Sequence, residues 1–281
     1  MKRIIILSGL VAVALLSGVS CKQDGKKTVP PVPAPVIDTL RTETFTEVKD
    51  IELKRIYHVD YSLSAEYVTD DRLAPVVLDS MNCAIAQALF GVRNPQVKAL
   101  AIAKEADVRE WFEDGIWEDT YPEEGEDIDG IDFSELFTDG SWQLSGEFGD
   151  EAPEGFLNYN VSGSDYMFGA AHGYYYFAPV VIELRTGCRL REEQLFKEDY
   201  REGLAQLLFY YLEQSENYED GMLLWDEGIY PNNNFLLTAD GISYFYNPYE
   251  ITAYAYGLIQ VDIPASALKP LLSDQYATIW N

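Results

Sequence analysis

The sequence is poor in the residues on which most metal and nucleophilic chemistry depends. Its 281 residues include two histidines, His58 and His172, and three cysteines. It has no H-E-x-x-H pattern and no clustered Cys and His spacing that could complete a zinc site. A G-x-S-x-G nucleophile elbow and a phosphate-binding P-loop are also absent. We therefore expect no cofactor and no resident metal, and we favour a binding protein over an enzyme.

Positive charge is scarce as well. Lys and Arg number 20 against 47 Asp and Glu, which gives a formal net charge of −27. Nucleic-acid binding is excluded, because neutralising phosphates requires clustered Lys and Arg. A negative field of this size keeps a protein soluble first, and it also attracts cationic partners. Disorder is excluded for most of the chain, because the residues are 47% hydrophobic and 14% aromatic.

The apolar run at the N-terminus is too short to span a membrane. Lys2 and Arg3 precede thirteen mostly apolar residues, 4–16, which is typical of a signal-peptide h-region. Small residues then lead to Cys21 in a pattern that resembles the bacterial lipobox. We predict a lipoprotein signal peptide over residues 1–20 and lipidation of Cys21. The alternative is an ordinary secretory peptide cut near Ser20.

A lipid on Cys21 predicts a location in the cell envelope. Two or more acyl chains hold a protein stably on a bilayer. The globular part would then lie outside the cytoplasm, at the outer membrane if the cell has two membranes. Residues 21–45 read as a tether, because the stretch Pro30–Pro35 favours polyproline II at about 3.1 Å per residue. A first strand beginning near Val36 is the alternative.

Residues 46–140 have the pattern of a strand-then-helices subdomain. Residues 51–68 alternate in the manner of strands. A helix is predicted over 72–90, with Asp70 and Asp71 as N-cap candidates and Gly91 as its stop. Pro95 begins a second predicted helix.

Residues 141–281 are richer in strands. Alternation predicts strands at 142–148, 156–161 and 258–263, and an apolar run at 174–184 leads to a hairpin turn at Arg185-Thr186-Gly187. Strands 235–237 and 242–246 flank a second turn at Ala239-Asp240-Gly241. Helices are predicted over 199–213 and 264–272. We expect an α+β fold of two small subdomains, each with antiparallel sheets packed against helices.

Two further features are ambiguous. The acidic stretch 113–139 reads as a solvated loop, because glycine in Asp127–Asp132 falls two positions too early for an EF-hand calcium loop. Cys83 falls within a helical pattern and is expected to be a buried small hydrophobe. A Cys83–Cys188 disulfide is the less favoured reading, since export permits it but geometry restricts it.

The second half carries motifs of a known family. Gly169-Ala170-Ala171-His172-Gly173 is similar to a Gly-Gly-Ala-His-Pro motif, with Gly173 in place of proline. Thr186-Gly187 followed by Leu190, Leu195 and Phe196 is similar to the family's turn and helix start. The closing hairpin, residues 234–264, includes the motif Tyr244-Phe245-Tyr246-Asn247-Pro248-Tyr249-Glu250-Ile251. These residues resemble the DUF3298 family. The part before them resembles the DUF4163 module that commonly precedes it.

The resemblance implies a role at the cell surface. This pairing occurs in the extracellular region of RsiV-type anti-sigma factors, where it is a lysozyme-binding sensor, and before the catalytic domain of the peptidoglycan deacetylase PdaC. We expect neither a sigma-binding segment nor a deacetylase domain in this chain. The implied partners are lysozyme or another cationic protein, with peptidoglycan or another glycan as the alternative.

His172 and a group of tyrosines are the candidate binding residues. His172 lies in a small-residue turn, although a histidine packed against a backbone carbonyl is the favoured reading of it. An outward-facing set of tyrosines on a strand could stack on sugars or anchor a protein partner, whereas an inward-facing set would form core. The residues selected are His172, Tyr174, Tyr246, Tyr249 and Tyr254. An envelope enzyme acting through His172 and nearby carboxylates is the least favoured reading.

Overall fold

The computed structural model describes residues 40–116, 137–149, 152–216, 218–224 and 228–280. The predicted signal peptide and Cys21 lie outside these residues, as do most of the predicted tether and the Asp127–Asp132 stretch. The signal peptide, the lipidation of Cys21, the tether and the acidic loop therefore stay predictions.

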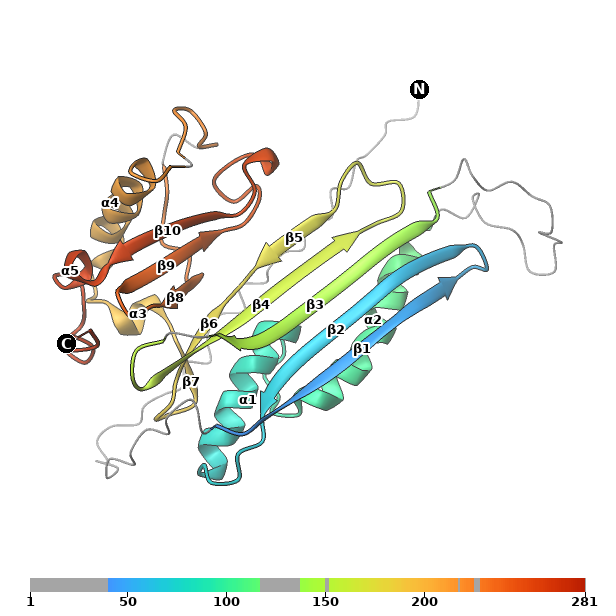
Figure 1. Cartoon of the computed structure of the whole chain (residues 1–281), viewed down its shortest axis with the longest axis horizontal. Coiled ribbons are helices and arrows are strands. Elements are labelled where there is room, and N and C mark those ends of the chain that lie inside the picture. Colours follow the sequence, from blue (N-terminus) through green and yellow to red (C-terminus); the bar gives the residue numbers. More distant parts are fainter. Residues whose placement is uncertain (1–39, 117–136, 150–151, 217, 225–227, 281) are drawn as a thin grey trace. The chain divides into compact units, whose positions relative to one another are not determined.

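A seven-stranded sheet forms the larger part of the fold (Figure 1). Its strands are β1 (Thr42–Leu53), β2 (Tyr57–Val68), β3 (Asp139–Gly149), β4 (Phe156–Tyr166), β5 (Tyr174–Phe177), β6 (Val180–Glu183) and β7 (Cys188–Leu190). The order is β1-β2-β3-β4-β6-β7, and β5 also pairs with β4. All the pairings are antiparallel except β2 with β3. That pair is parallel because the chain between the two strands makes a long crossover that includes two helices.

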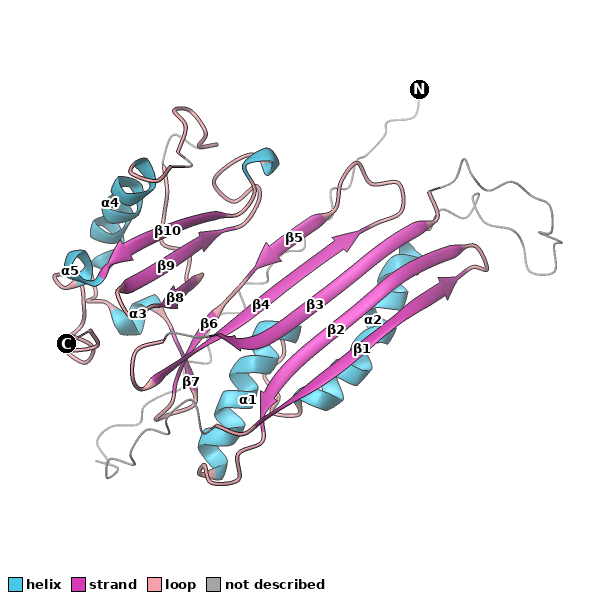
Figure 2. Ribbon diagram, in the orientation of Figure 1, coloured by secondary structure: helices cyan, strands magenta, loops and turns pink. Residues whose placement is uncertain are grey.

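The helices α1 (Pro75–Phe90) and α2 (Val97–Asp114) cover one face of this sheet (Figure 2). The odd-numbered residues of β2 from Tyr57 to Ala65 are buried, whereas the even-numbered ones remain partly or fully exposed. This alternation is what the strand period of two requires when one face is covered. From the helices, Met81, Ile85 and Phe112 are each fully buried in the same core.

A three-stranded sheet forms the smaller part, in the order β10-β9-β8. Its strands are β8 (Phe235–Leu237), β9 (Gly241–Tyr246) and β10 (Ile259–Pro264). The accompanying helices are α3 (Glu192–Leu195), α4 (Tyr200–Glu213), the 3-10 turn η3 (Tyr254–Tyr256) and α5 (Ala265–Leu268). The helix α4 packs on β10 through a leucine stripe at Leu204, Leu208 and Leu212. All six residues of the central strand β9 are buried.

The large and the small sheet each have a hydrophobic core, and the strand β6 contributes side chains to both. Val180 and Ile182 belong to the first core, whereas Val181 between them belongs to the second. Asn158 on β4 joins the two sheets, because its side-chain amide donates to the Leu237 carbonyl at 2.7 Å and its oxygen accepts from the Leu237 N–H at 3.2 Å. The strand β8 is thereby fixed to β4.

The α+β class with antiparallel-rich sheets packed against helices is confirmed. Two boundaries differ from the sequence-based expectation. The strand β1 begins at Thr42, so the last residues of the predicted tether, 42–45, belong to the sheet. The predicted subdomain boundary after residue 140 falls inside β3, whose pairing with β2 runs across it.

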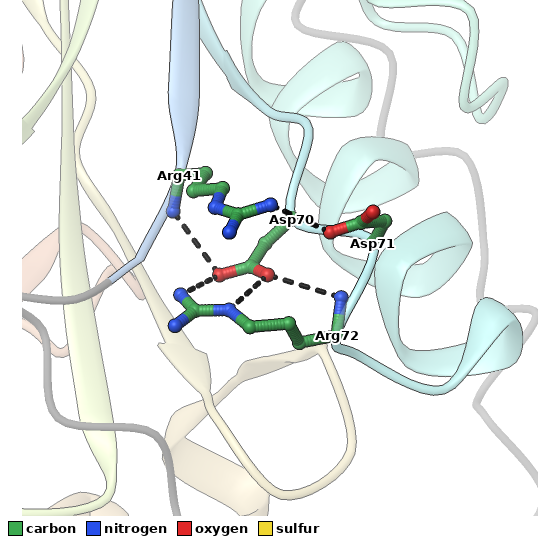
Figure 3. A network of polar contacts seen from close by, with 4 residues as sticks. All are labelled: Arg41, Asp70, Asp71 and Arg72. Carbon is green, nitrogen blue, oxygen red and sulfur yellow. Dashed lines mark hydrogen bonds and ion pairs between the residues drawn. The ribbon is translucent and has the colours of Figure 1, made fainter.

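The N-terminus of α1 also differs from the prediction. The N-cap is Ala74, and neither Asp70 nor Asp71 caps the helix. Asp70 is 1% exposed and instead accepts hydrogen bonds from Arg72 Nε at 2.7 Å and from the Arg41 N–H at 3.2 Å (Figure 3). Arg41 in turn forms an ion pair with Asp71 at 2.8 Å. Asp70 therefore fastens the start of β1 to the turn before α1. The predicted stop is confirmed, since Gly91 takes φ 70° at the C-cap.

Candidate functional site

Exposed rings gather where β5 passes the loop that joins β9 to β10. They belong to His172, Tyr175 and Tyr249, and the half-buried ring of Tyr254 joins them; we call these four residues the aromatic patch. His172 precedes β5, Tyr175 lies on it, and the two other tyrosines come from the β9–β10 loop. Tyr175 is 37% exposed and Tyr249 51%. Large apolar rings gathered at a surface in this way are typical of binding sites.

His172 is the centre of the patch. Its ring stacks on that of Tyr254, with centroids 4.0 Å apart and an interplanar angle of 24°. Its Nδ1 lies 3.0 Å from the Gly173 carbonyl oxygen, and its Nε2 lies 3.1 Å from the Tyr249 hydroxyl. A carbonyl can only accept, so the Nδ1 of the neutral ring carries the proton and Nε2 accepts from Tyr249. The backbone-carbonyl contact is the one favoured from the sequence.

Tyr254 connects the remaining members. Its hydroxyl donates to the Gly173 carbonyl at 2.8 Å, which fixes the loop to the residue before β5. Its ring lies 5.9 Å from Tyr175, edge to face, and 5.6 Å from Tyr249. The four rings are therefore one connected group that joins segments about 80 residues apart in sequence.

Tyr249 has an unusual backbone conformation for an aromatic residue. Its φ is 68°, in the left-handed region that side chains with a Cβ disfavour. The turn holds it there, because the Tyr249 N–H donates to the Thr252 carbonyl and the Glu250 N–H donates to the Asn247 carbonyl. An exposed residue kept under backbone strain points to a role for its side chain, since packing does not require the ring at that position.

A polar layer supports the turn that carries Tyr249. The Glu250 carboxylate accepts from Asn232 Nδ2 at 2.7 Å and from the Asn247 N–H at 3.0 Å. Burial raises the pKa of Glu250, and these two hydrogen bonds act in the opposite direction. Asn247 Oδ1 also accepts from the Phe177 N–H at 2.7 Å. The turn is thereby fixed to the end of β5.

The structure brings together three of the five residues selected from the sequence, namely His172, Tyr249 and Tyr254. Tyr174 is exposed on β5, but its ring contacts Tyr176, which faces the large core. Tyr246 is fully buried in β9, and its hydroxyl donates to the Tyr230 carbonyl at 2.7 Å.

Sequence reasoning did not select Tyr175. Strand alternation contained the signal, because Tyr175 and Phe177 fall on the face opposite Tyr174 and Tyr176. Phe177 stacks edge to face on Phe245 with centroids 4.7 Å apart, so this face turns toward the small sheet.

The segments that build the patch contain no Lys or Arg. The sequence has neither residue between Arg109 and Arg185, or between Arg201 and Lys269. A carboxylate lies nearby, because Tyr256 donates to Glu219 at 3.3 Å. Half-buried Asp165 pairs in register with Tyr174 and so lies on the face of β5 opposite Tyr175. Burial raises the pKa of Asp165. The patch therefore combines ring faces with an acidic surrounding.

The second histidine of the chain lies on another part of the large sheet. His58, the second histidine, lies on the β1–β2 hairpin 2.9 Å from Asp50, and both side chains are exposed. Within the described ranges, no group of three or more His, Cys, Asp and Glu residues could hold a metal ion. The helices of that same part of the chain include none that is long and apolar enough to cross a membrane.

The fold is of the α+β class, and part of the chain is similar to a family of known proteins. Residues 193–266 match the model of the DUF3298 family, described as a protein of unknown function. This stretch includes the loop that carries Tyr249 and Tyr254. A search of curated proteins finds no match.

Two solved structures share the fold. A member of the DUF3298 family from Bacteroides fragilis NCTC 9343 is 23% identical, with a TM-score of 0.68 over 86% of this chain and 96% of the other. A DUF3298 family protein from Pseudomonas aeruginosa PAO1 is 14% identical, with a TM-score of 0.57 over 84% and 96%.

Proposed function

We propose that this protein is a lipid-anchored module of the bacterial envelope that binds a cationic protein such as lysozyme through the aromatic patch. The observation that carries the proposal is the connected group of rings with Tyr249 held under strain at its exposed side. Tyrosines anchor protein partners efficiently, since a large rigid ring loses little entropy on binding.

Two features favour a cationic partner. Lys and Arg side chains are attracted to tyrosine faces, more strongly when water is excluded. The formal charge of −27, with no Lys or Arg in the segments that build the patch, adds long-range attraction. The resemblance of residues 46–140 to the DUF4163 module, and of the pair to RsiV-type lysozyme sensors, supports lysozyme as the first partner to test.

The test is binding of lysozyme to the full-length chain at low and physiological salt. We expect Tyr254→Ala to weaken binding at least about tenfold, the effect of losing an interface anchor. The matched control is Tyr210→Ala, because Tyr210 is 54% exposed on α4 and belongs to no part of the patch. Absence of binding even at low salt, or equal losses in both variants, would refute the proposal.

A glycan is the second candidate ligand, favoured by the stacked pair of His172 and Tyr254 with polar groups at its rim. Sugars bind to such flat faces through their apolar C–H surfaces while hydroxyls bond at the edge. Sedimentation of the chain with purified peptidoglycan, lost in Tyr254→Ala and kept in Tyr210→Ala, would favour this reading over the first.

The anchor has its own test. Cys21→Ser removes the thiol that would accept lipid, and the variant should leave the membrane fraction for the soluble one. Persistence of the variant in the membrane fraction would contradict lipid anchoring without affecting the binding proposal.

A further inference from the structure

The outer edge of β5 has a regular main-chain pattern. The Ala178 N–H donates to the Val161 carbonyl of β4 at 2.8 Å, so Ala178 faces β4. The main-chain groups of Phe177 point the other way, because its N–H donates to Asn247 Oδ1 and its carbonyl accepts from Asn234 Nδ2. Antiparallel pairing alternates these orientations residue by residue. The N–H and C=O of Tyr175 therefore also point away from β4.

Side chains satisfy the edge on both sides of Tyr175. Phe177 is bound by the two asparagines, at 2.7 and 2.9 Å. The Gly173 carbonyl accepts from Tyr254 at 2.8 Å and from His172 at 3.0 Å. Between them, the main-chain N–H and C=O of Tyr175 have no hydrogen-bond partner among the residues that the structure describes. One donor and one acceptor on a strand edge remain open at the aromatic patch.

We infer that this edge binds an extended peptide segment, one residue of which exchanges two main-chain hydrogen bonds with Tyr175. A donor and an acceptor on one side of one residue are matched by another extended main chain. The neighbouring side chain of the bound segment lies over the tyrosine rings and is Lys or Arg, given the cation-free segments around it. The inference rests on the proposed function and names the part of the partner that the patch holds.

The strand edge fits a short contact better than a long one. Both main-chain groups of Phe177 and the carbonyl of Gly173 are already hydrogen-bonded, which limits the length of edge that a bound segment can pair with. The bound segment therefore gains specificity from one pair of main-chain bonds and from its cationic side chain. A strand edge whose neighbouring main-chain groups are already hydrogen-bonded also resists the indefinite strand addition that causes aggregation.

The probe is a blocked peptide of alternating Lys and Thr, added to the 15N-labelled full-length chain. We expect the amide resonance of Tyr175 to move downfield, and those of Asn234 and Asn247 to move less. A peptide of the same sequence with N-methylated main-chain nitrogens keeps its charge but loses its donors, and it should bind at least about fivefold more weakly. Equal binding of the two peptides, with an unmoved Tyr175 amide, would overturn the inference.

A pair of variants separates the contribution of the Tyr175 main-chain N–H to peptide binding from that of the Tyr175 ring. Tyr175→Ala removes the ring and keeps the N–H, whereas Tyr175→Pro removes both. Proline is tolerated here because the lost N–H faces away from β4. We expect Tyr175→Pro to bind the peptide at least about threefold more weakly than Tyr175→Ala. If Tyr175→Pro fails to fold, the N-methylated peptide with the unaltered chain gives the same comparison.

The outcomes distinguish this inference from the proposed function. Lysozyme binding that is lost in Tyr254→Ala but equal in the two Tyr175 variants would overturn main-chain pairing and leave the function standing. Peptide binding that depends on the N–H, without lysozyme binding, would support the pairing and remove lysozyme as partner. A Tyr175 amide that moves with N-acetylglucosamine oligomers and not with the peptide would overturn the inference in favour of a glycan.

Discussion

At the scale of single residues, the side chains of Tyr249 and Asp70 differ in how much they contribute to the stability of the fold. Tyr249 is exposed and occupies a strained backbone region, so the fold gains little from its ring. Asp70 is buried and accepts four hydrogen bonds from Arg41 and Arg72, so the fold depends on its charge. Substitutions at the two positions should therefore separate binding from folding.

Tyr249→Asn should leave the free energy of unfolding unchanged or raise it by about 1 kcal/mol, because asparagine accepts the left-handed region more readily. Chemical denaturation measures this. Tyr210→Asn on α4 is the matched control and should change stability by less than about 0.5 kcal/mol, since the helix propensities of the two residues are similar. A loss of more than about 2 kcal/mol in Tyr249→Asn would show that the ring serves the fold.

Asp70 should make stability depend on pH in the acid range. The side-chain hydrogen bond from Arg72 holds the pKa of Asp70 well below its usual range. A depressed pKa in the folded state contributes stability above the unfolded value, and this is lost as pH falls below about 4. The difference in unfolding free energy between the unaltered chain and Asp70→Asn should therefore shrink from neutral pH toward about pH 2.

Comparing the two chains at each pH removes the effect of other groups. Burial raises the pKa of Glu192 and of Glu250, and their contributions change in the opposite direction on acidification. Both glutamates are present in the variant, so their effects cancel in the difference. A difference that stays constant or grows on acidification would contradict the role given to Asp70.

At the scale of elements, the turn between β6 and β7 packs against α1 without room for a side chain. Gly187 has φ 69°, and a Cβ there would lie 2.3 Å from the Val77 carbonyl oxygen and 2.9 Å from the Met81 N–H nitrogen. Gly91, at the end of α1, has nearly the same φ of 70° but open space around it. The two glycines separate the effect of conformation from that of close packing.

Gly91→Ala should cost about 1 kcal/mol, the effect of a left-handed backbone alone. Gly187→Ala meets the same effect together with a clash against helix backbone, and should cost about 3 kcal/mol or more. Thermal and chemical unfolding of the two variants test this comparison. Equal costs would mean that the turn moves away from α1 without loss.

The strands and helices could be predicted from the sequence where a local pattern of residues determines them. The turn signal Ala239-Asp240-Gly241 predicted the β8–β9 hairpin, and the helix predicted over 199–213 matches α4. The long run 174–184 was expected as one segment, but it divides into β5 and β6 at Ala178-Pro179, and both parts pair with β4. The parallel pairing of β2 with β3 depends on contacts distant in sequence, which no local pattern encodes.

The candidate site was also predictable only in part, because some of its features depend on contacts distant in sequence. Glycines and tyrosines pointed to His172, Tyr249 and Tyr254 before any contact among them was known. Alternation in β9 suggested that one set of its aromatics faces outward. The strand is instead central in its sheet and covered on both faces, so Tyr244 and Tyr246 are fully buried together with Phe245 at 7% exposure. The number of covered faces depends on the tertiary fold, which periodicity does not contain.

At the scale of the whole molecule, the charge of −27 and the aromatic patch affect different parts of a binding reaction. Long-range attraction accelerates encounter with a cationic partner and is screened by salt. Ring contacts form after encounter and determine how long the complex lasts. Rates of association and dissociation can therefore be assigned to separate features of the chain.

The association rate constant with lysozyme should fall about tenfold or more between about 25 mM and about 500 mM salt, while the dissociation rate constant changes much less. Tyr249→Asn removes a ring without changing charge, so it should keep the same salt dependence of association and dissociate about tenfold faster. Stopped-flow or surface-based kinetics on both chains measure the four rate constants. If the substitution instead slows association at every salt concentration and leaves dissociation unchanged, the patch acts in encounter, and the division between charge and rings is wrong.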